Sequence, residues 1–197
     1  MSEPCAVVLA AGYGRRFAAQ AGRQANKLLA PCSGLNGVER PVLAHSLLAF
    51  DQWRGERLLV MRLGSPGQGE MTALADRYGF DTLVVPSAGM GESLSAAIRA
   101  RSQAAGWLVA LGDMPWIRPQ THTRLAEAMT AGHAVVPRYQ GKRGHPVCFD
   151  KAYADELMAL NGDQGGRRLL EQGCVTLVEV DDPGVLRDVD LPGDLAL

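Results

Sequence analysis

Short apolar runs alternate along the chain with segments in which apolar residues recur at helical spacing. Runs of this kind, rich in β-branched residues, indicate buried strands, and a 3.6-residue period indicates helices that pack by one face. We expect strands at residues 6–10, 57–63, 82–86, 107–111, 134–137, 146–149 and 175–180. We expect helices at residues 42–51, 69–78, 92–103, 119–131, 151–160 and 165–172. The alternation predicts an α/β fold of three layers, with a mostly parallel central sheet and helices on both faces.

One segment departs from this alternation. Residues 12–40 carry neither a clear strand nor a clear helical period, and we expect them to form a long irregular loop. A compact domain seldom keeps such a loop unless it is functional or mobile. We therefore expect residues 12–40 to have a functional use or to be mobile.

Composition narrows the class of protein. The chain has 197 residues, 47% of them hydrophobic and 21% charged, which is typical of one globular domain spanning residues 1–197. With 20 Lys and Arg against 21 Asp and Glu, the net charge of −1 argues against nucleic-acid or membrane partners. The chain shows no signal peptide, no membrane-length apolar run and no C-x-x-C spacing among its four cysteines, so we expect a cytoplasmic protein with reduced thiols.

Small residues follow the first expected strand, in the order Leu9-Ala10-Ala11-Gly12-Tyr13-Gly14-Arg15-Arg16, with Asn26-Lys27 further on. Small side chains let the backbone approach a ligand, and successive free N–H groups after a strand bind anions. Arg16 and Lys27 supply positive charge of the kind that neutralises phosphates. The segment is neither a P-loop nor a complete dinucleotide fingerprint. The alternative is an ordinary glycine turn flanked by two solvated cations.

Acidic residues occur where an expected strand ends and again near the C-terminus. Asp113 follows the strand at 107–111, at the sheet edge where ligands bind in open α/β folds, and could hold Mg²⁺ together with substrate phosphates. The alternative for Asp113 is a turn or helix-capping residue. Asp188 and Asp190 would share one face of a strand, and either could complete a metal site.

These motifs resemble, in order and over almost the whole chain, the NTP-transferase superfamily of molybdenum cofactor guanylyl- and cytidylyltransferases. The resemblance is carried by five segments: the glycine loop with Lys27, Gly112-Asp113-Met114-Pro115, Asp188-Val189-Asp190, residues 86–94 and residues 137–146. Three features resemble the cytidylyltransferase branch of this superfamily. Position 11 is alanine, where the guanylyltransferases usually carry a second glycine. The other two are the Gly89-Met90-x-x-Ser93-Leu94 and Gly141-x-x-Gly144-His145-Pro146 patterns.

The resemblance implies a Rossmann-like nucleotidyltransferase fold, with a small acceptor-side hairpin insertion near residues 137–149. It implies transfer of CMP from CTP to the phosphate of molybdopterin, with release of pyrophosphate and with Mg²⁺, or else Mn²⁺, as cofactor. The implied nucleotide-binding residues are Leu9, Ala10, Ala11, Gly12, Gly14, Ser87, Gly89 and Ser93. The implied catalytic residues are Arg16, Lys27 and Asp113, the metal ligands are Asp113 and Asp190, and the acceptor-binding residues are Lys142, Arg143 and His145.

The chain also departs from the family pattern. Residues 17–25 lengthen the loop before Lys27, which leaves open whether the lysine reaches the site, and Leu191 and Gly193 replace the usual Thr and Glu near the C-terminus. His145 is expected to position the acceptor, since an ionised phosphate needs no general base. Two alternatives remain: transfer to another acceptor, such as a sugar or alcohol phosphate, and a non-catalytic nucleotide-binding or chaperone-like partner of a molybdoenzyme. A molybdoenzyme or a chaperone is also expected as a transient partner.

Overall fold

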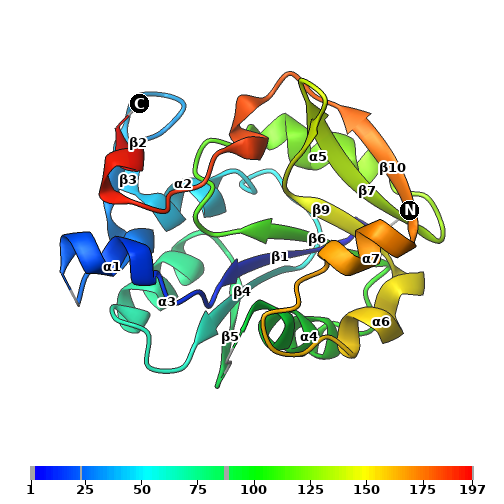
Figure 1. Cartoon of the computed structure of the whole chain (residues 1–197), viewed down its shortest axis with the longest axis horizontal. Helices are drawn as coiled ribbons and strands as arrows, with labels where there is room; N and C mark the ends of the chain where they lie inside the picture. The colour runs from blue at the N-terminus through cyan, green and yellow to red at the C-terminus, as the bar shows by residue number, and fades with distance from the viewer. Residues whose placement is uncertain (1–2, 23, 87–88, 197) are drawn as a thin grey trace.

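The central element of the molecule is an eight-stranded sheet (Figure 1). The computed structural model describes residues 3–22, 24–86 and 89–196. The strand order is β10-β7-β9-β6-β1-β4-β5, with β8 paired to β7. The strands are β1 (Cys5–Ala10), β4 (Arg57–Arg62), β5 (Asp81–Val85), β6 (Gly106–Leu111), β7 (His133–Tyr139), β8 (Lys142–Arg143), β9 (Val147–Asp150) and β10 (Cys174–Glu179).

Most of the sheet is parallel, as the alternation of elements predicts. Strand β1 pairs in parallel with both β4 and β6, β4 with β5, and β7 with β10. Strand β9 runs antiparallel between β6 and β7, and β8 runs antiparallel to β7. The parallel pairs need crossover connections, and the helices supply them.

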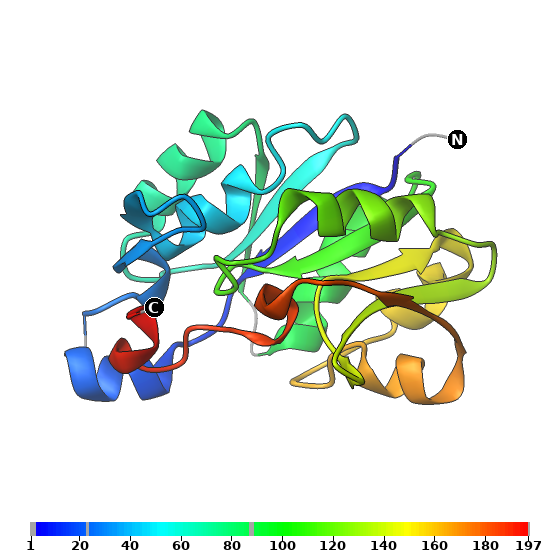
Figure 2. The same ribbon diagram turned by 90° about the horizontal axis from the view of Figure 1, so that it is seen from above.

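Helices cover both faces of the sheet, which confirms the expected three-layer α/β class (Figure 2). One face packs against α2 (Val42–Leu48), α3 (Gln68–Arg77) and α5 (Pro119–Glu127), and the other against α4 (Met90–Ala100) and α6 (Ala154–Met158). The protein has one hydrophobic core on each face of the sheet, and successive side chains of strand β1 pack alternately into the two cores. Among the described residues, no helix is long and apolar enough to cross a membrane.

The prediction that residues 12–40 form an irregular loop is wrong. The segment contains helix α1 (Arg15–Ala21), the 3₁₀ turn η1 (Lys27–Leu29) and a two-stranded hairpin of β2 (Pro31–Ser33) and β3 (Glu39–Pro41). Helix α1 has only seven residues, and Phe17 is its one buried residue, so it leaves almost no periodic apolar signal. Tertiary contacts give the segment its structure.

Smaller differences concern the ends of elements. The helix expected at 151–160 divides into the 3₁₀ turn η2 (Lys151–Tyr153) and α6, and the last helix, α7, covers only Arg167–Gln172. The hairpin expected near residues 137–149 is a tight β7–β8 turn through Gln140 and Gly141, and β9 pairs with β6 and β7 in the central sheet. Of the four free cysteines, Cys174 is exposed and the other three are buried.

The order of the strands places a binding crevice at the carboxyl ends of β1 and β6. From β1 the chain first builds β4 and β5 on one side and then crosses to β6 on the other. At such a switch point the connections leave in opposite directions, which opens a crevice at the carboxyl ends of the strands. Here those ends are Ala10 of β1 and Leu111 of β6, joined where the Gly112 N–H donates to the Leu9 carbonyl oxygen (2.9 Å).

Candidate active site

The glycine loop leaves β1 at this crevice and lines a cavity of about 230 Å³. Gly14 has a left-handed backbone (φ 57°), which glycine adopts without strain, and from there the chain turns directly into α1. The walls of this first cavity include Leu9, Ala10, Gly12 and Gly14 from the loop, together with Lys27 and Asp113. Ala11, predicted with this group, is half-buried and is not among the lining residues.

Four charged side chains from distant parts of the sequence meet beside this loop. Lys27 Nζ lies 2.6 Å from Asp113 Oδ2 and 3.3 Å from Asp190 Oδ1. Arg16 Nη1 lies 2.8 Å from Asp190 Oδ2. The lengthened loop therefore delivers Lys27 to the site, and all the residues predicted as catalytic or metal-binding lie in one cluster.

Hydrogen bonds fix the segments that carry Lys27, Asp113 and Asp190. The Asn26 side chain accepts from the Leu28 N–H and fixes the turn that carries Lys27. The Val189 N–H donates to the Asp113 carbonyl oxygen (2.9 Å), so the C-terminal segment is bound directly to the end of β6. Asp194 accepts from the N–H groups of Asp190 and Leu191 and fixes the turn that follows.

The charges of the cluster stabilise one another. Burial by itself lowers the pKa of Lys27, but the neighbouring carboxylates of Asp113 and Asp190 outweigh it and hold that pKa above its ordinary value. Burial would likewise raise the pKa of Asp190, yet Lys27 and Arg16 hold it below the usual range. Asp188 shows the opposite result: burial, then Asp113 and Asp190, raise its pKa. Lys27 is therefore cationic and Asp190 anionic near neutral pH.

The carboxylates suit a hard divalent cation. Asp113 Oδ1 is buried and has no hydrogen-bond partner among the described residues, while Oδ2 is engaged by Lys27. Mg²⁺ and Mn²⁺ bind such oxygens and usually complete their shell with substrate phosphates and water. No group of three or more acidic, His or Cys side chains able to hold a metal occurs in the part of the chain that the structure describes. Asp113 and Asp190 therefore fit a metal that is shared with a phosphorylated ligand.

A second cavity, of about 470 Å³, lies on the other side of Leu9, which lines both. Its walls are mainly apolar, with Met90 and Leu94 from α4 and Val109 and Leu111 from β6. Two of the predicted acceptor-binding residues, Arg143 and His145, line it, whereas Lys142 is exposed on β8 outside it.

His145 is a half-buried side chain that lines this second cavity, and its Nδ1 atom is buried. Burial lowers its pKa despite the nearby carboxylates of Asp113 and Asp188, and its Nδ1 has no hydrogen-bond partner among the described residues. Its backbone N–H donates to the Val185 carbonyl oxygen (2.9 Å). A neutral imidazole with an unpartnered ring nitrogen can position a polar group of a ligand.

The predicted nucleoside-contacting segment lies at the start of α4. The Ser93 side chain is 1% exposed, and its hydroxyl donates to the Gly89 carbonyl oxygen (3.1 Å), within the first turn of the helix. A side chain on Gly89 would collide with the Gly162 carbonyl group, so the glycine allows close packing against the loop before α7. Neither residue lines the two cavities, and Ser87 lies outside the described residues.

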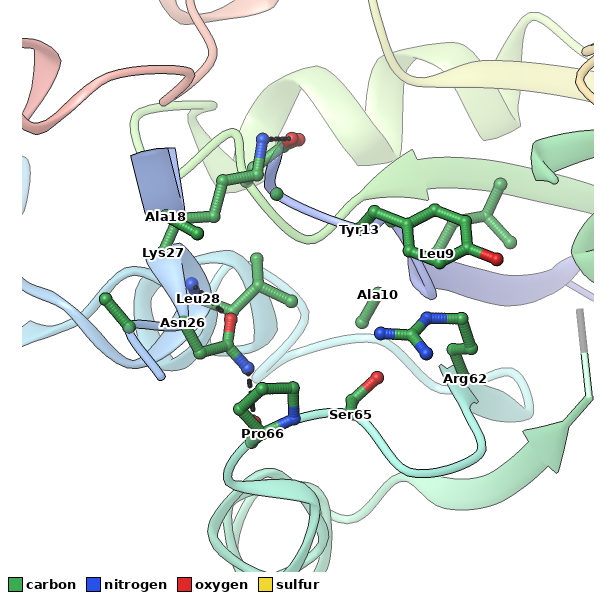
Figure 3. Close-up of a pocket in the computed structure, with 14 residues that line it drawn as sticks. Leu9, Ala10, Tyr13, Ala18, Asn26, Lys27, Leu28, Arg62, Ser65 and Pro66 are labelled. Atoms are coloured by element: carbon green, nitrogen blue, oxygen red, sulfur yellow. Dashed lines mark hydrogen bonds and ion pairs between the residues drawn. The ribbon is translucent and has the colours of Figure 1, made fainter. Parts of the chain in front are cut away.

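Sequence reasoning missed part of the first cavity. Arg62 and Ser65, at and just after the end of β4, line it together with Tyr13 of the glycine loop (Figure 3). Strand β4 neighbours β1, and parallel strands have their carboxyl ends on the same side of the sheet, so the residues that follow β4 lie near the glycine loop that follows β1. Recognising this required the strand order, which the sequence alone does not give.

A three-layer α/β fold with a glycine loop and a Lys-Asp-Asp-Arg cluster at its switch point defines a nucleotide-handling enzyme of the phosphoryl-transfer class. Residues 6–177 match the MobA-like NTP transferase domain, and the chain belongs to that family. It is therefore a nucleotidyltransferase, a class of enzyme that uses a nucleoside triphosphate and a phosphorylated acceptor.

Three solved structures are similar to this one over nearly the whole chain. Rv0371c from Mycobacterium tuberculosis H37Rv is similar with a TM-score of 0.80 and 29% identity, over 98% of this chain and 96% of that one. The complex of Rv0371c with manganese gives a TM-score of 0.76 and 28% identity, over 98% and 95% of the two chains. A nucleotidyl transferase from Methanothermobacter, 22% identical with a TM-score of 0.78, shares the fold over 98% of this chain and 94% of that one.

One curated relative matches more locally. The purine catabolism protein PucB of Bacillus subtilis (strain 168) is 31% identical over 109 residues, and the match spans 53% of this chain and 53% of PucB. The similarity therefore covers about half of either protein.

Proposed function

We propose that this nucleotidyltransferase transfers the CMP group of CTP to the phosphate of a small acceptor, and that the acceptor is molybdopterin. The observation that carries the proposal is the convergence of Arg16, Lys27, Asp113 and Asp190 beside the glycine loop, where Lys27 and Asp113 line the first cavity and Leu9 lines both cavities. In this proposal the first cavity holds the nucleotide and the second holds the acceptor.

The charged cluster supports transfer without a protein nucleophile. An acceptor phosphate oxygen forms a new bond to the α-phosphorus of the nucleotide, and the bond between that phosphorus and the bridging oxygen to the β-phosphate breaks. Pyrophosphate leaves with the electron pair, and no proton must move. Positioning and charge neutralisation supply the catalysis in such reactions. Lys27, which its carboxylate neighbours keep cationic, and Arg16 would neutralise the charge of the leaving pyrophosphate.

Asp113 and Asp190 would hold the divalent metal, Mg²⁺ or Mn²⁺. When bound, the metal supplies positive charge to the phosphate oxygens. The unpartnered Asp113 Oδ1 supports this assignment, and the manganese complex of Rv0371c is consistent with it. Lys27 lies between the two carboxylates, so its ammonium group would turn from them toward the nucleotide phosphates when these enter.

The second cavity suits an acceptor with an apolar or aromatic body and an anionic group. Its walls are mostly aliphatic, Arg143 offers a positive charge, and the neutral His145 offers a ring nitrogen. Leu9 lies between the cavities, so the two substrates would meet beside it. Lys142 is exposed on the β7–β8 turn and would contact an acceptor only at its outer end.

The choice of CTP rests on the sequence. Ala11 and the Gly89-Met90-x-x-Ser93-Leu94 pattern resemble the cytidylyltransferase branch. Ser93 would act here by fixing the first turn of α4 through its bond to Gly89, and Gly89 by keeping that turn close to the base.

The experiment measures pyrophosphate release from each of the four NTPs with molybdopterin, a sugar phosphate or an alcohol phosphate as acceptor. We expect turnover with CTP and molybdopterin, and a higher kcat/KM for CTP than for GTP in direct competition. A preference for GTP would overturn the cytidylyl assignment, and turnover with another acceptor alone would overturn molybdopterin. Asp113→Ala is the control, and we expect it to lose far more than tenfold in turnover while remaining folded.

A further inference from the structure

Two polar atoms in the first cavity lack a partner, and the family resemblance assigns them no role. Arg62 Nε and Ser65 Oγ are both buried, and neither has a hydrogen-bond partner among the described residues. Ser65 is only 8% exposed, and both residues line the cavity. Figure 3 shows the Arg62 guanidinium and the Ser65 hydroxyl pointing into one space, on the opposite side of the cavity from Lys27.

Unpartnered buried polar atoms are unfavourable in a folded protein, and those that face a cavity indicate a ligand that completes them. None of the ion pairs among the described residues involves Arg62. The guanidinium therefore offers its N–H groups to whatever enters the cavity. Arg62 only donates, while the Ser65 hydroxyl can donate or accept, so an acceptor oxygen satisfies both.

The two side chains are held in place before a ligand binds. The Arg62 guanidinium stacks on the Tyr13 ring at 4.4 Å from the ring centroid, and Arg15 stacks on the same ring at 4.5 Å. The Ser65 N–H donates to the Arg62 carbonyl oxygen (3.2 Å), which forms the turn between the two residues. The next residue, Pro66, accepts from the Asn26 side chain at 2.7 Å.

The position of Arg62 indicates which part of a nucleotide it meets. In the sheet, Ala10 pairs with Met61, and Arg62 pairs with Val85 at the end of β5. Arg62 therefore lies at the end of β4, between the end of β1, where the glycine loop begins, and the end of β5. The resemblance associates the glycine loop with the nucleoside. The cations of the charged cluster, Arg16 and Lys27, are bound to Asp190 and Asp113 instead.

We propose that Arg62 Nε and Ser65 Oγ bind the carbonyl oxygen of the donor's nucleobase, with Tyr13 as the wall that holds Arg62. This inference rests on the proposed function, because it takes the first cavity as the NTP site. Cytosine and guanine each carry one ring carbonyl group, and adenine carries none. The pair therefore selects against ATP, while other groups distinguish CTP from GTP.

The test is calorimetric titration with CTP, ATP and inorganic tripolyphosphate, each with Mg²⁺. The proteins are the wild type, Arg62→Met, Ser65→Ala and Arg15→Met. We expect Arg62→Met to weaken CTP binding about tenfold or more, and Ser65→Ala about threefold to tenfold, as for a lost hydrogen bond to a charged and a neutral group. Binding of tripolyphosphate should not change, and the preference for CTP over ATP should shrink. Arg15→Met, which removes the other cation on Tyr13, should keep that preference.

Other results would overturn the inference. Equal weakening of CTP and tripolyphosphate would show that Arg62 binds a phosphate, and wild-type affinity for CTP in both variants would show that the pair binds nothing in the nucleotide. If Arg62→Met fails to fold by circular dichroism, Ser65→Ala decides the question. A wild-type preference for GTP changes the nucleotide used but not the test. A wild-type protein that binds neither CTP nor GTP overturns the proposed function, and this inference with it.

Discussion

Lys27 occupies the most constrained position in the charged cluster. Its side chain is 12% exposed and contacts two carboxylates that belong to different parts of the chain. The Arg16 side chain, by contrast, is 79% exposed, and Asp190 is its only ion-pair partner among the described residues. Removing one partner of a buried ion pair destabilises a protein much more than removing one partner of an exposed pair, because the remaining charge stays buried without compensation. The two cations therefore differ in environment although both would serve the same leaving group.

This difference leads to a kinetic prediction. Lys27→Ala should lower kcat more than it raises KM for the nucleotide, because stabilisation confined to the transition state appears in kcat. The expected loss is on the order of 100-fold, as for the removal of one charged contact in a shielded site. Steady-state kinetics with varied CTP measure both constants.

Arg16→Ala is the comparison variant. We expect a smaller loss, because solvent reaches the guanidinium and replaces part of its effect. If Lys27→Ala raised KM and left kcat unchanged, the lysine would bind the ground-state nucleotide only. If Arg16→Ala were inactive while Lys27→Ala remained near normal, the assignment of charge neutralisation to Lys27 would be wrong.

At the scale of elements, the C-terminal segment carries Asp190 into the site. The chain passes from β10 through the 3₁₀ turn η3 (Pro183–Leu186) and reaches the η4 turn (Pro192–Leu195). Within η3, the Val185 carbonyl oxygen accepts from the His145 N–H, and between the two turns the Val189 N–H donates to the Asp113 carbonyl oxygen. The segment is therefore bound first beside the second cavity and then at the end of β6. A side chain on Gly144 would lie 2.3 Å from the Val185 oxygen, so the close approach requires glycine there.

One carboxylate joins this segment to helix α5. Asp182 is 2% exposed and accepts from the Arg118 N–H (2.9 Å), the Thr121 hydroxyl (2.6 Å) and the Gly184 N–H (3.0 Å). Helix α5 has no side-chain cap of its own, and Asp182 instead binds the N–H of its N-cap residue, Arg118, and the hydroxyl of Thr121 in its first turn. The same side chain thereby orders η3 and the start of α5.

Asp182→Ala should therefore destabilise the fold by about 2–4 kcal/mol, because it leaves buried donors without an acceptor. Urea denaturation measures the free energy of unfolding. Asp182→Asn should lose less, since its amide oxygen retains part of the acceptor capacity. Asp181→Ala is the matched control: its side chain is 96% exposed and lies 3.9 Å from Arg118, so we expect a change within about 0.5 kcal/mol. Equal effects at both positions would contradict the capping role.

At the scale of the whole molecule, the sheet separates two hydrophobic cores, one on each of its faces. Both cavities are lined by Leu9, near the carboxyl end of β1. The layer beside α2, α3 and α5 contains a stacked pair, with the His122 ring 4.1 Å from the Phe50 ring, centroid to centroid. Burial lowers the pKa of His122 to about 4, outweighing its contact with the Ala49 carbonyl oxygen and the charge of Asp182. The core thus contains a histidine that is neutral when folded.

Stability should consequently depend on acid pH. The unfolded chain binds a proton at His122 with an ordinary pKa near 6.5, whereas the folded protein binds it only near 4. The contribution of the neutral His122 to stability is complete above pH ~6.5 and falls as pH decreases to about 4, by up to about 3 kcal/mol. Urea denaturation between pH 4 and 7.5 measures the loss.

The control is His122→Gln, which cannot bind a proton in this range. Its overall stability should be lower, but its pH dependence should be weaker than that of the wild type. Some dependence should remain, because burial also lowers the pKa of His45 and His145. Identical pH profiles for the two proteins would show that His122 does not control acid stability.

The sequence by itself determined the features that follow from local periodicity and from residue type. The strands and most of the helices are set by apolar runs and helical spacing, so the α/β class was predictable. The glycine loop and Asp113 were predictable as well, because each directly follows a buried strand and the strand's end fixes where they lie.

The tertiary structure decided which distant residues meet. Nothing local shows that a lengthened loop still brings Lys27 within 2.6 Å of Asp113, or that Asp190 reaches both Lys27 and Arg16. Helix α1 was missed because its one buried residue gives no period, and Arg62 and Ser65 were missed because their place depends on β4 lying beside β1. Periodicity records which face of an element is buried, whereas the packing of elements against one another sets which side chains share a cavity.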